Sequence, residues 1–215
     1  MSQLLSVTSE ASRRSSAAPG AVAIIASAGG IPALMTLLGS LPDTFPLPIF
    51  VAQHLGRWPS ALDRILGWRC ALRVGWAVDG AEPRAGHVHL VPPGMRLGIA
   101  AAGFDLSPLP PRSSSWLASG DHLIKTVATR YRERSIGIVL SGMMRAGIDG
   151  LRAIKACGGF VIAQDRASSH CFEMPAAAID FAKAEIVMPP ERIASVLTII
   201  APGGRTAPQC RTVAT

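Results

Sequence analysis

Three short apolar segments of this chain each end close to residues that could perform hydrolytic chemistry. The first ends at Ser27, the second ends just before His54, and the third leads into a glycine-rich stretch that contains Asp149. A serine, a histidine and an acid brought together would supply a nucleophile, a general base and a group that orients the base. These residue types therefore indicate hydrolase chemistry, and the acid is the member that needs most scrutiny.

The segments that must position these residues alternate between strand-like and helix-like patterns. Strands are predicted at 21–26, 48–52, 72–78, 87–91, 96–101, 136–140, 159–163 and 185–188, and helices at 30–40, 58–67, 120–133, 147–157, 174–183 and 190–200. This alternation predicts a doubly wound, three-layer α/β sandwich with a mostly parallel sheet. Ligands bind beyond the carboxyl ends of parallel strands, so Ser27 and His54 should meet at that edge.

The remaining segments complete the predicted organisation. Residues 86–99, with Pro-Pro-Gly between two strand-like runs, predict a β-hairpin at a sheet edge. Residues 103–118, rich in Pro and Ser, predict a loop. We expect one domain over 21–201, a disordered tail at 1–20 and a flexible tail at 202–215.

The composition narrows the possible function classes. The chain is 49% hydrophobic and 16% charged, which is typical of a globular protein. No apolar run reaches the roughly 18 residues of a membrane span, and no secretory signal is recognisable, so we expect a cytoplasmic protein without membrane insertion. The cysteines, which lack the spacing of metal ligands, predict free thiols and no metal site; they are Cys70, Cys157, Cys171 and Cys210.

The formal net charge of +7 comes mostly from arginines that are scattered along the chain. Nucleic-acid binding is disfavoured because no basic run or interleaved aromatic ladder is present. The charge instead fits an acidic protein partner.

The local patterns leave several interpretations open. Ser27, which precedes Gly29, fits a nucleophile over a helix N-terminus, a helix N-cap or a phosphate-binding loop, although no dinucleotide or P-loop signature is present. His54 fits a general base or a structural histidine. His87 and His89 are predicted to be surface residues on one face of the hairpin.

Taken in order, these landmarks resemble the catalytic domain of CheB-type chemotaxis protein-glutamate methylesterases over about residues 20–200. The matching motifs are Ser27-Ala28-Gly29-Gly30, Gln53-His54, the segment from Gly86 to Gly94, Ser119-Gly120-Asp121-His122-Leu123, Leu140 to Met143, Gly158-Gly159, Gln164-Asp165 and Met174-Pro175-Ala176-Ala177.

The resemblance implies a Ser-His-Asp triad in which Ser27 is the nucleophile and His54 the base. It implies oxyanion-binding amides near Ala28 and Met143, and no cofactor. The implied reaction is hydrolysis of the γ-methyl ester of glutamate on the cytoplasmic helices of chemoreceptors, and also deamidation of receptor glutamines.

The chain departs from the family pattern at three positions of these motifs. Ala146 stands where the pattern has the catalytic aspartate, and Met144 and Glu173 each replace a glycine. Asp149, three residues later, fits either a substitute acid or a helix-start acid that interacts favourably with the helix dipole. We also expect no receiver domain. The sequence therefore leaves three functions open: a methylesterase, a non-catalytic module that binds receptors or signalling partners, and a hydrolase of another ester.

Overall fold

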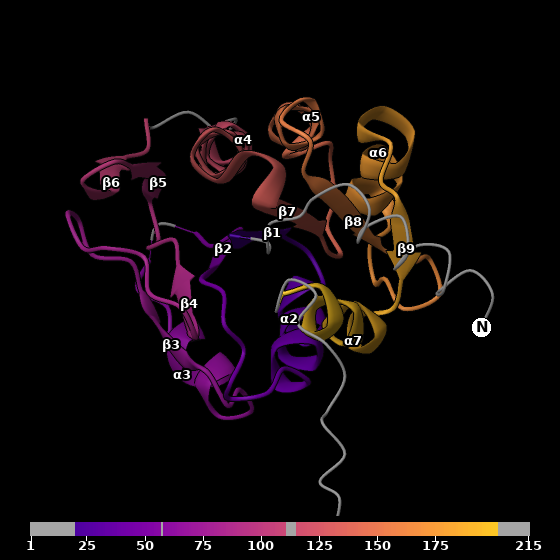
Figure 1. Ribbon diagram of the computed structural model, residues 1–215, viewed down its shortest axis with the longest axis horizontal. Coiled ribbons are helices and arrows are strands. Elements are labelled where there is room, and N and C mark those ends of the chain that lie inside the picture. The colour runs from indigo at the N-terminus through magenta and orange to yellow at the C-terminus, as the bar shows by residue number, and fades with distance from the viewer. Residues whose placement is uncertain (1–19, 57, 111–114, 202–215) are drawn as a thin grey trace, which may run out of the picture.

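A seven-stranded sheet lies at the centre of the computed structural model, which describes residues 20–56, 58–110 and 115–201 (Figure 1). All neighbouring strands in it run parallel, in the order β3-β4-β2-β1-β7-β8-β9. Their bounds are β1 (Ala21–Ala26), β2 (Ile49–Gln53), β3 (Arg73–Trp76), β4 (His87–Leu90), β7 (Ser135–Val139), β8 (Phe160–Gln164) and β9 (Ile186–Met188). The predicted α/β class is confirmed.

Helices cover both faces of the sheet. One layer contains α4 (Ser115–Tyr131), α5 (Ile148–Ala156) and α6 (Glu173–Ala182), and a short 3-10 helix, η1 (Arg132–Arg134), follows α4. The opposite side carries α2 (Gly30–Gly39), α3 (Leu62–Gly67) and α7 (Pro190–Ile200) (Figure 1). No helix in the described ranges has the length and apolar character needed to cross a membrane.

The central strand β1 is apolar at every position because it is covered on both faces. All of its residues are fully buried, and their side chains alternate between two hydrophobic clusters. Val22 and Ile24 belong to the cluster on the side of α2 and α7, whereas Ala23 and Ile25 belong to the cluster under α4 and α5. A strand covered on both faces has no solvent-facing side on which polar residues would be favoured.

The hairpin prediction was wrong in its strands and its place. β4 pairs in parallel with β2 and β3 inside the main sheet, so β3 is the edge strand. The antiparallel hairpin instead joins β5 (Met95–Ala100) to β6 (Gly103–Pro108) as a separate two-stranded sheet. The predicted loop at 103–118 therefore contains a strand and the start of α4. The Pro-Pro-Gly turn connects β4 of the main sheet to β5 of the separate hairpin. Strand propensity alone does not show whether two consecutive strands pair with each other or belong to different sheets.

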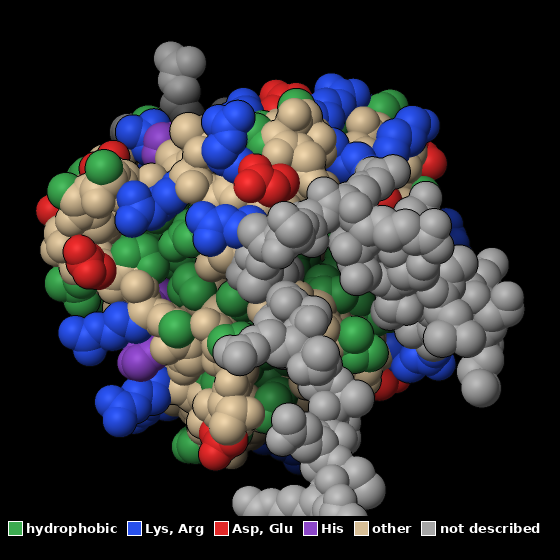
Figure 2. Space-filling view, in the orientation of Figure 1, with side chains coloured by type: hydrophobic (Ala, Val, Ile, Leu, Met, Phe, Trp, Pro, Cys, Tyr) green, Lys and Arg blue, Asp and Glu red, His purple; other side chains and the backbone are tan. Residues whose placement is uncertain are grey.

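The predicted tails, 1–20 and 202–215, lie outside the described residues apart from Gly20. Cys210 also lies outside them, and Cys70, Cys157 and Cys171 are free thiols. Lys and Arg side chains are distributed around the face in Figure 2 with Asp and Glu among them, in agreement with the scattered basic residues of the sequence.

A half-buried carboxylate connects α4 to the beginning of α5. Asp121 Oδ1 accepts a 2.8 Å hydrogen bond from the Gly150 N–H, one of the first amides of α5 that no carbonyl of the same helix can satisfy. Burial raises the pKa of Asp121, and the bond from Gly150 opposes that rise. Gly150 lets the two helices pack closely, since a Cβ atom at this position would lie only 2.7 Å from the Ile124 Cβ.

We expect Asp121→Ala to lower the free energy of unfolding by about 1–3 kcal/mol, because it leaves the buried Gly150 N–H without its acceptor. Asp149→Ala is the matched control, since Asp149 is an exposed acid in the same region whose ion pair contributes at most about 1 kcal/mol. Urea unfolding of both variants measures the difference. Equal losses would mean that the Asp121 bond is not a specific support of α5.

Candidate active site

Ser27 and His54 lie together at the carboxyl edge of the sheet, as predicted. Parallel pairing places Ala26 beside Gln53 at the ends of β1 and β2, so the next residues of both strands leave the sheet side by side. Ser27 Oγ is 3.4 Å from His54 Nδ1. This is a long hydrogen bond, and such distances are common in sites without substrate. A serine and a base in contact are the first requirement for nucleophilic catalysis.

The site occupies the switch point of the fold, where the chain leaves β1 for one half of the sheet and later returns to fill the other half. The Ser27 N–H donates to the Ser141 carbonyl at 3.0 Å, and the Leu140 N–H donates to the Ile25 carbonyl at 3.0 Å. The loops after β1 and β7 are thereby held against each other. Crevices at such points are the usual ligand sites of open α/β sheets.

Gln53 joins the loops that carry Ser27 and His54. Its Nε2 donates to the Ser27 carbonyl at 3.0 Å and to the His54 carbonyl at 3.2 Å. Its Oε1 is buried, and no hydrogen-bond partner for it exists among the described residues. The sequence motif included Gln53, but only the structure assigns it this bridging position.

Ser141 is a buried structural serine. Its Oγ donates to the Ala28 carbonyl at 2.7 Å and accepts from the Cys171 N–H at 2.8 Å. Its own N–H donates to Gln164 Oε1 at 2.8 Å. These bonds join the loops after β1 and β7 to the segment before α6.

Gly29 makes the sharp turn that ends the Ser27 loop. It is the N-cap of α2 and has a φ of 73°, in the left-handed region that glycine adopts without strain. A Cβ atom at this position would lie 2.4 Å from the His170 Cβ and 2.7 Å from Ser141 Oγ. No side chain caps α2, so the interpretation of Ser27 as a helix N-cap was wrong.

Amide groups near Ser27 are available to bind negative charge. Within the described residues, the N–H groups of Ala28 and Met143 take part in no hydrogen bond. The loop that contains Met143 packs closely on Ser27. The neighbouring Gly142 allows this approach, since a Cβ atom there would lie 3.0 Å from the Ser27 Cβ. The geometry is compatible with the two oxyanion donors that the resemblance implies.

The His54 ring faces Ser27 with Nδ1, whereas the serine of the archetypal triad faces Nε2. If Ser27 donates its proton, the neutral ring carries its own proton on Nε2, and an orienting acid would have to bind that nitrogen. Burial lowers the pKa of His54 below its ordinary value of 6.5. The neutral form, which is the form that can act as a base, is therefore favoured near neutral pH.

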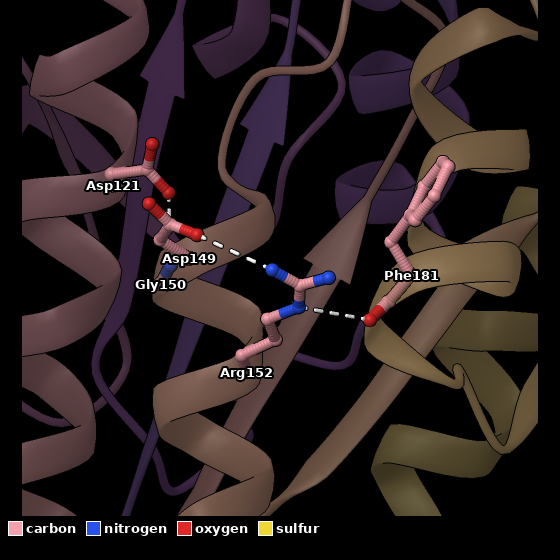
Figure 3. Close-up of polar contacts among 5 residues, drawn as sticks. All are labelled: Asp121, Asp149, Gly150, Arg152 and Phe181. Atoms are coloured by element: carbon pink, nitrogen blue, oxygen red, sulfur yellow. Dashed lines mark hydrogen bonds and ion pairs between the residues drawn. The ribbon is translucent and has the colours of Figure 1, made fainter.

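Asp149 points to a different set of partners (Figure 3). Its carboxylate lies 3.7 Å from the Arg152 guanidinium, and 64% of its side chain is exposed. Arg152 Nε in turn donates to the Phe181 carbonyl at 3.0 Å, which links α5 to α6. These contacts match the interpretation of Asp149 as an exposed acid in the first turn of α5.

Ala146 is buried in the apolar cluster that also contains Ile25 and Ala52. Ala52 lies two residues before His54 on the same segment, so Ala146, where the resemblance implies an acid, packs in the cluster next to the edge of the sheet that carries His54. A carboxylate here would be removed from water, which costs free energy unless it gains a hydrogen-bond partner.

The other histidines do not assemble a metal site. No group of three potential His, Cys, Asp or Glu ligands occurs in the part of the chain that the structure describes. The prediction that His89 is a surface residue was wrong, because its ring packs on Phe50 and Phe104. Burial lowers the pKa of His89 to about 4. Its Nε2 accepts a hydrogen bond from the Arg84 N–H at 3.1 Å, which requires the neutral ring.

The fold and this site define a doubly wound α/β protein with a serine–histidine pair at the switch point. The chain belongs to the CheB methylesterase family, whose model matches residues 22–197. It is similar to the protein-glutamate methylesterase/protein-glutamine glutaminase 1 of Syntrophus aciditrophicus (strain SB), with 36% identity over 189 residues, 87% of this chain and 53% of that protein. A protein of the same name from Bordetella avium (strain 197N) is 40% identical over 164 residues, 75% of this chain and 48% of its own length.

The structural comparison agrees. The crystal structure of the Thermotoga maritima CheB methylesterase catalytic domain superimposes with a TM-score of 0.78 at 30% identity, over 84% of this chain and 99% of that domain. The present chain spans about half the length of these curated relatives.

We expect the His54 imidazole to titrate with a midpoint below 6.5, since burial disfavours its charged form. A proton NMR titration of the histidine ring signals measures this midpoint, and His54→Gln assigns the resonance. His89, with an expected midpoint of about 4, provides a buried reference in the same spectrum. A His54 midpoint above 6.5 would show that a nearby negative charge outweighs desolvation.

Proposed function

We propose that this chain is a serine-type carboxylic-ester hydrolase whose α/β domain, about residues 21–201, removes methyl groups from protein glutamate γ-methyl esters. The observation that carries the proposal is the contact between Ser27 Oγ and His54 Nδ1, 3.4 Å apart at the switch point. Family membership supports the same reaction, since relatives over this region are named protein-glutamate methylesterases.

In the proposed reaction, Ser27 Oγ attacks the ester carbonyl carbon and His54 Nδ1 takes the hydroxyl proton. The negative charge that develops on the carbonyl oxygen is stabilised by the Ala28 and Met143 amides. Collapse of the tetrahedral intermediate breaks the bond to the methoxy oxygen, which leaves as methanol with the proton from His54. Water then attacks the acyl-serine in the same way and restores Ser27. Hydrolysis of a glutamine side chain would follow the same steps with ammonia as leaving group.

The alanine at position 146 predicts a slow enzyme. Losing the acid of a serine triad lowers turnover by about 10⁴ while the serine and histidine stay in place. That factor corresponds to about 5.5 kcal/mol of transition-state stabilisation. The acid contributes by selecting the histidine tautomer and by balancing the positive charge that forms on the ring during attack.

The proposed substrate is a methylated helix of the cytoplasmic part of a chemoreceptor, and the proposed location is the cytoplasm. The net charge of +7 supports binding to acidic helices and predicts weaker binding at higher salt. The proposed chemistry needs no cofactor, because amide groups hold the oxyanion.

A second candidate is a module that binds methylated receptors without processing them. The observation that favours it is the burial of Ala146 in an apolar cluster, where the family pattern has a catalytic acid. The two candidates differ in turnover but share the binding surface.

We expect slow methanol release from a methyl-esterified receptor fragment, and we expect Ser27→Ala to abolish it because the nucleophile is lost. Binding of the fragment, measured by calorimetry, should persist in this variant. Ser40→Ala is the control, since the Ser40 hydroxyl lies on an exposed surface and bonds the Thr36 carbonyl. Binding without Ser27-dependent methanol release would favour the binding module over the hydrolase.

We expect Ala146→Asp to raise turnover by a factor of up to about 10⁴, because it returns a carboxylate to the family's acid position. Ala146→Asn is the matched control, since it has nearly the same size but cannot balance an imidazolium. Both variants should unfold at lower temperature than the parent, because they bury a polar group among apolar residues. If Asp149→Ala abolishes turnover while Ala146→Asp adds nothing, Asp149 is the acid and the proposed role of position 146 is wrong.

A further inference from the structure

The loop after β7 is joined to the start of α6 by a row of hydrogen bonds beside Ser27. The Gly142 N–H donates to the Cys171 carbonyl at 2.9 Å, and the Met174 N–H donates to the Gly142 carbonyl at 3.0 Å. One turn further out, the Met144 N–H donates to Glu173 Oε2 at 3.0 Å. This last bond depends on a side chain, whereas the first two use only backbone atoms and are open to any residue type.

Met144 and Glu173, the two residues of this bond, both stand where the family pattern has glycine. Met144 has a φ of 70°, in the left-handed region that a residue with a Cβ atom adopts only at a cost. Glycine at 144 would adopt this conformation freely, and glycine at 173 would offer no acceptor. A strained residue and a side chain that holds its amide therefore occur together in this chain.

We propose that Glu173 is a positioning residue. By accepting the Met144 N–H it fixes the turn at Met144, and this keeps the preceding Met143 N–H in its position near Ser27. The catalytic consequence rests on the proposed hydrolase function, whereas the structural role does not. Glu173 itself touches no reacting atom in this proposal. It acts through the backbone of Met143 and Met144.

A purely local role for Glu173 makes a different prediction. Glu173 lies in the first turn of α6, where a carboxylate also interacts favourably with the helix dipole. That interaction would be independent of the residue at position 144. The positioning role requires coupling between positions 144 and 173, which a double-mutant cycle measures.

The first test follows the exchange of the residue 144 amide hydrogen by NMR in the full chain. Glu173→Gly should speed this exchange by about tenfold or more, because the bonded amide becomes free to open locally. Glu173→Gln should keep it near the parent rate, since the amide oxygen can still accept. Glu191→Gly, which removes an acid from the first turn of α7, should leave it unchanged. Unchanged exchange in Glu173→Gly would overturn the proposal.

The second test measures the kinetics of a small p-nitrophenyl ester in a cycle of Glu173→Gly and Met144→Gly. In the Met144 parent, Glu173→Gly should lower kcat by about tenfold with KM nearly constant, and Glu173→Gln should restore most of it. In the Met144→Gly background the same change should cost less than about twofold, because glycine holds the turn unaided. Equal losses in both backgrounds would overturn the positioning role. If the parent shows no Ser27-dependent turnover, the proposed function fails, and the exchange test alone decides the role of Glu173.

Discussion

β1 pairs in parallel with β2 on one side and with β7 on the other, and the rest of the molecule depends on this double pairing. Both neighbours run in the same direction as β1, so the loops that follow Ala26, Gln53 and Val139 all emerge at one edge. The residues of β1 are buried on both faces by helices, which makes this part of the sheet rigid. A rigid edge allows the Ser27 and His54 side chains to meet, although 27 positions separate them in sequence.

Backbone hydrogen bonds and small residues then determine the shape of the site. Gly29 turns the chain where a side chain would collide with His170, and Gly142 lets the loop after β7 approach Ser27. Ser141 joins these loops from below through its buried hydroxyl. The loop around Met144 also contains a residue with positive φ, but that residue is not glycine. In our proposal a hydrogen bond from the Met144 N–H to a side-chain acceptor outside the loop therefore holds the turn. Glu173 is the group that supplies this acceptor.

The acids near the site illustrate how burial separates structural roles from proposed catalytic ones. Asp149 is exposed and pairs with Arg152, whereas Asp121 is half-buried and holds the start of α5. Ala146 removes a charge from an apolar cluster, which spares the cost of burying a carboxylate. A trade between stability and turnover at position 146 follows from this arrangement, and it is the physical basis of the slow hydrolase that we propose.

The sequence by itself determined the α/β class, the parallel core and the proximity of Ser27 to His54. Each of these two residues follows a buried strand, and the carboxyl ends of parallel strands lie at one edge of an open sheet. The sequence also showed the alanine at 146. Tertiary structure decided which strands form the hairpin, since Met95–Ala100 pairs with a segment whose Pro and Ser content suggested a loop. It decided that His89 is buried, because Phe50 and Phe104, which pack on its ring, come from segments far apart in the chain. It also placed the Asp149 carboxylate beside Arg152 of the same helix, at an exposed position. The contact between Met144 and Glu173 also joins segments that are distant in sequence, so no local pattern could have indicated it.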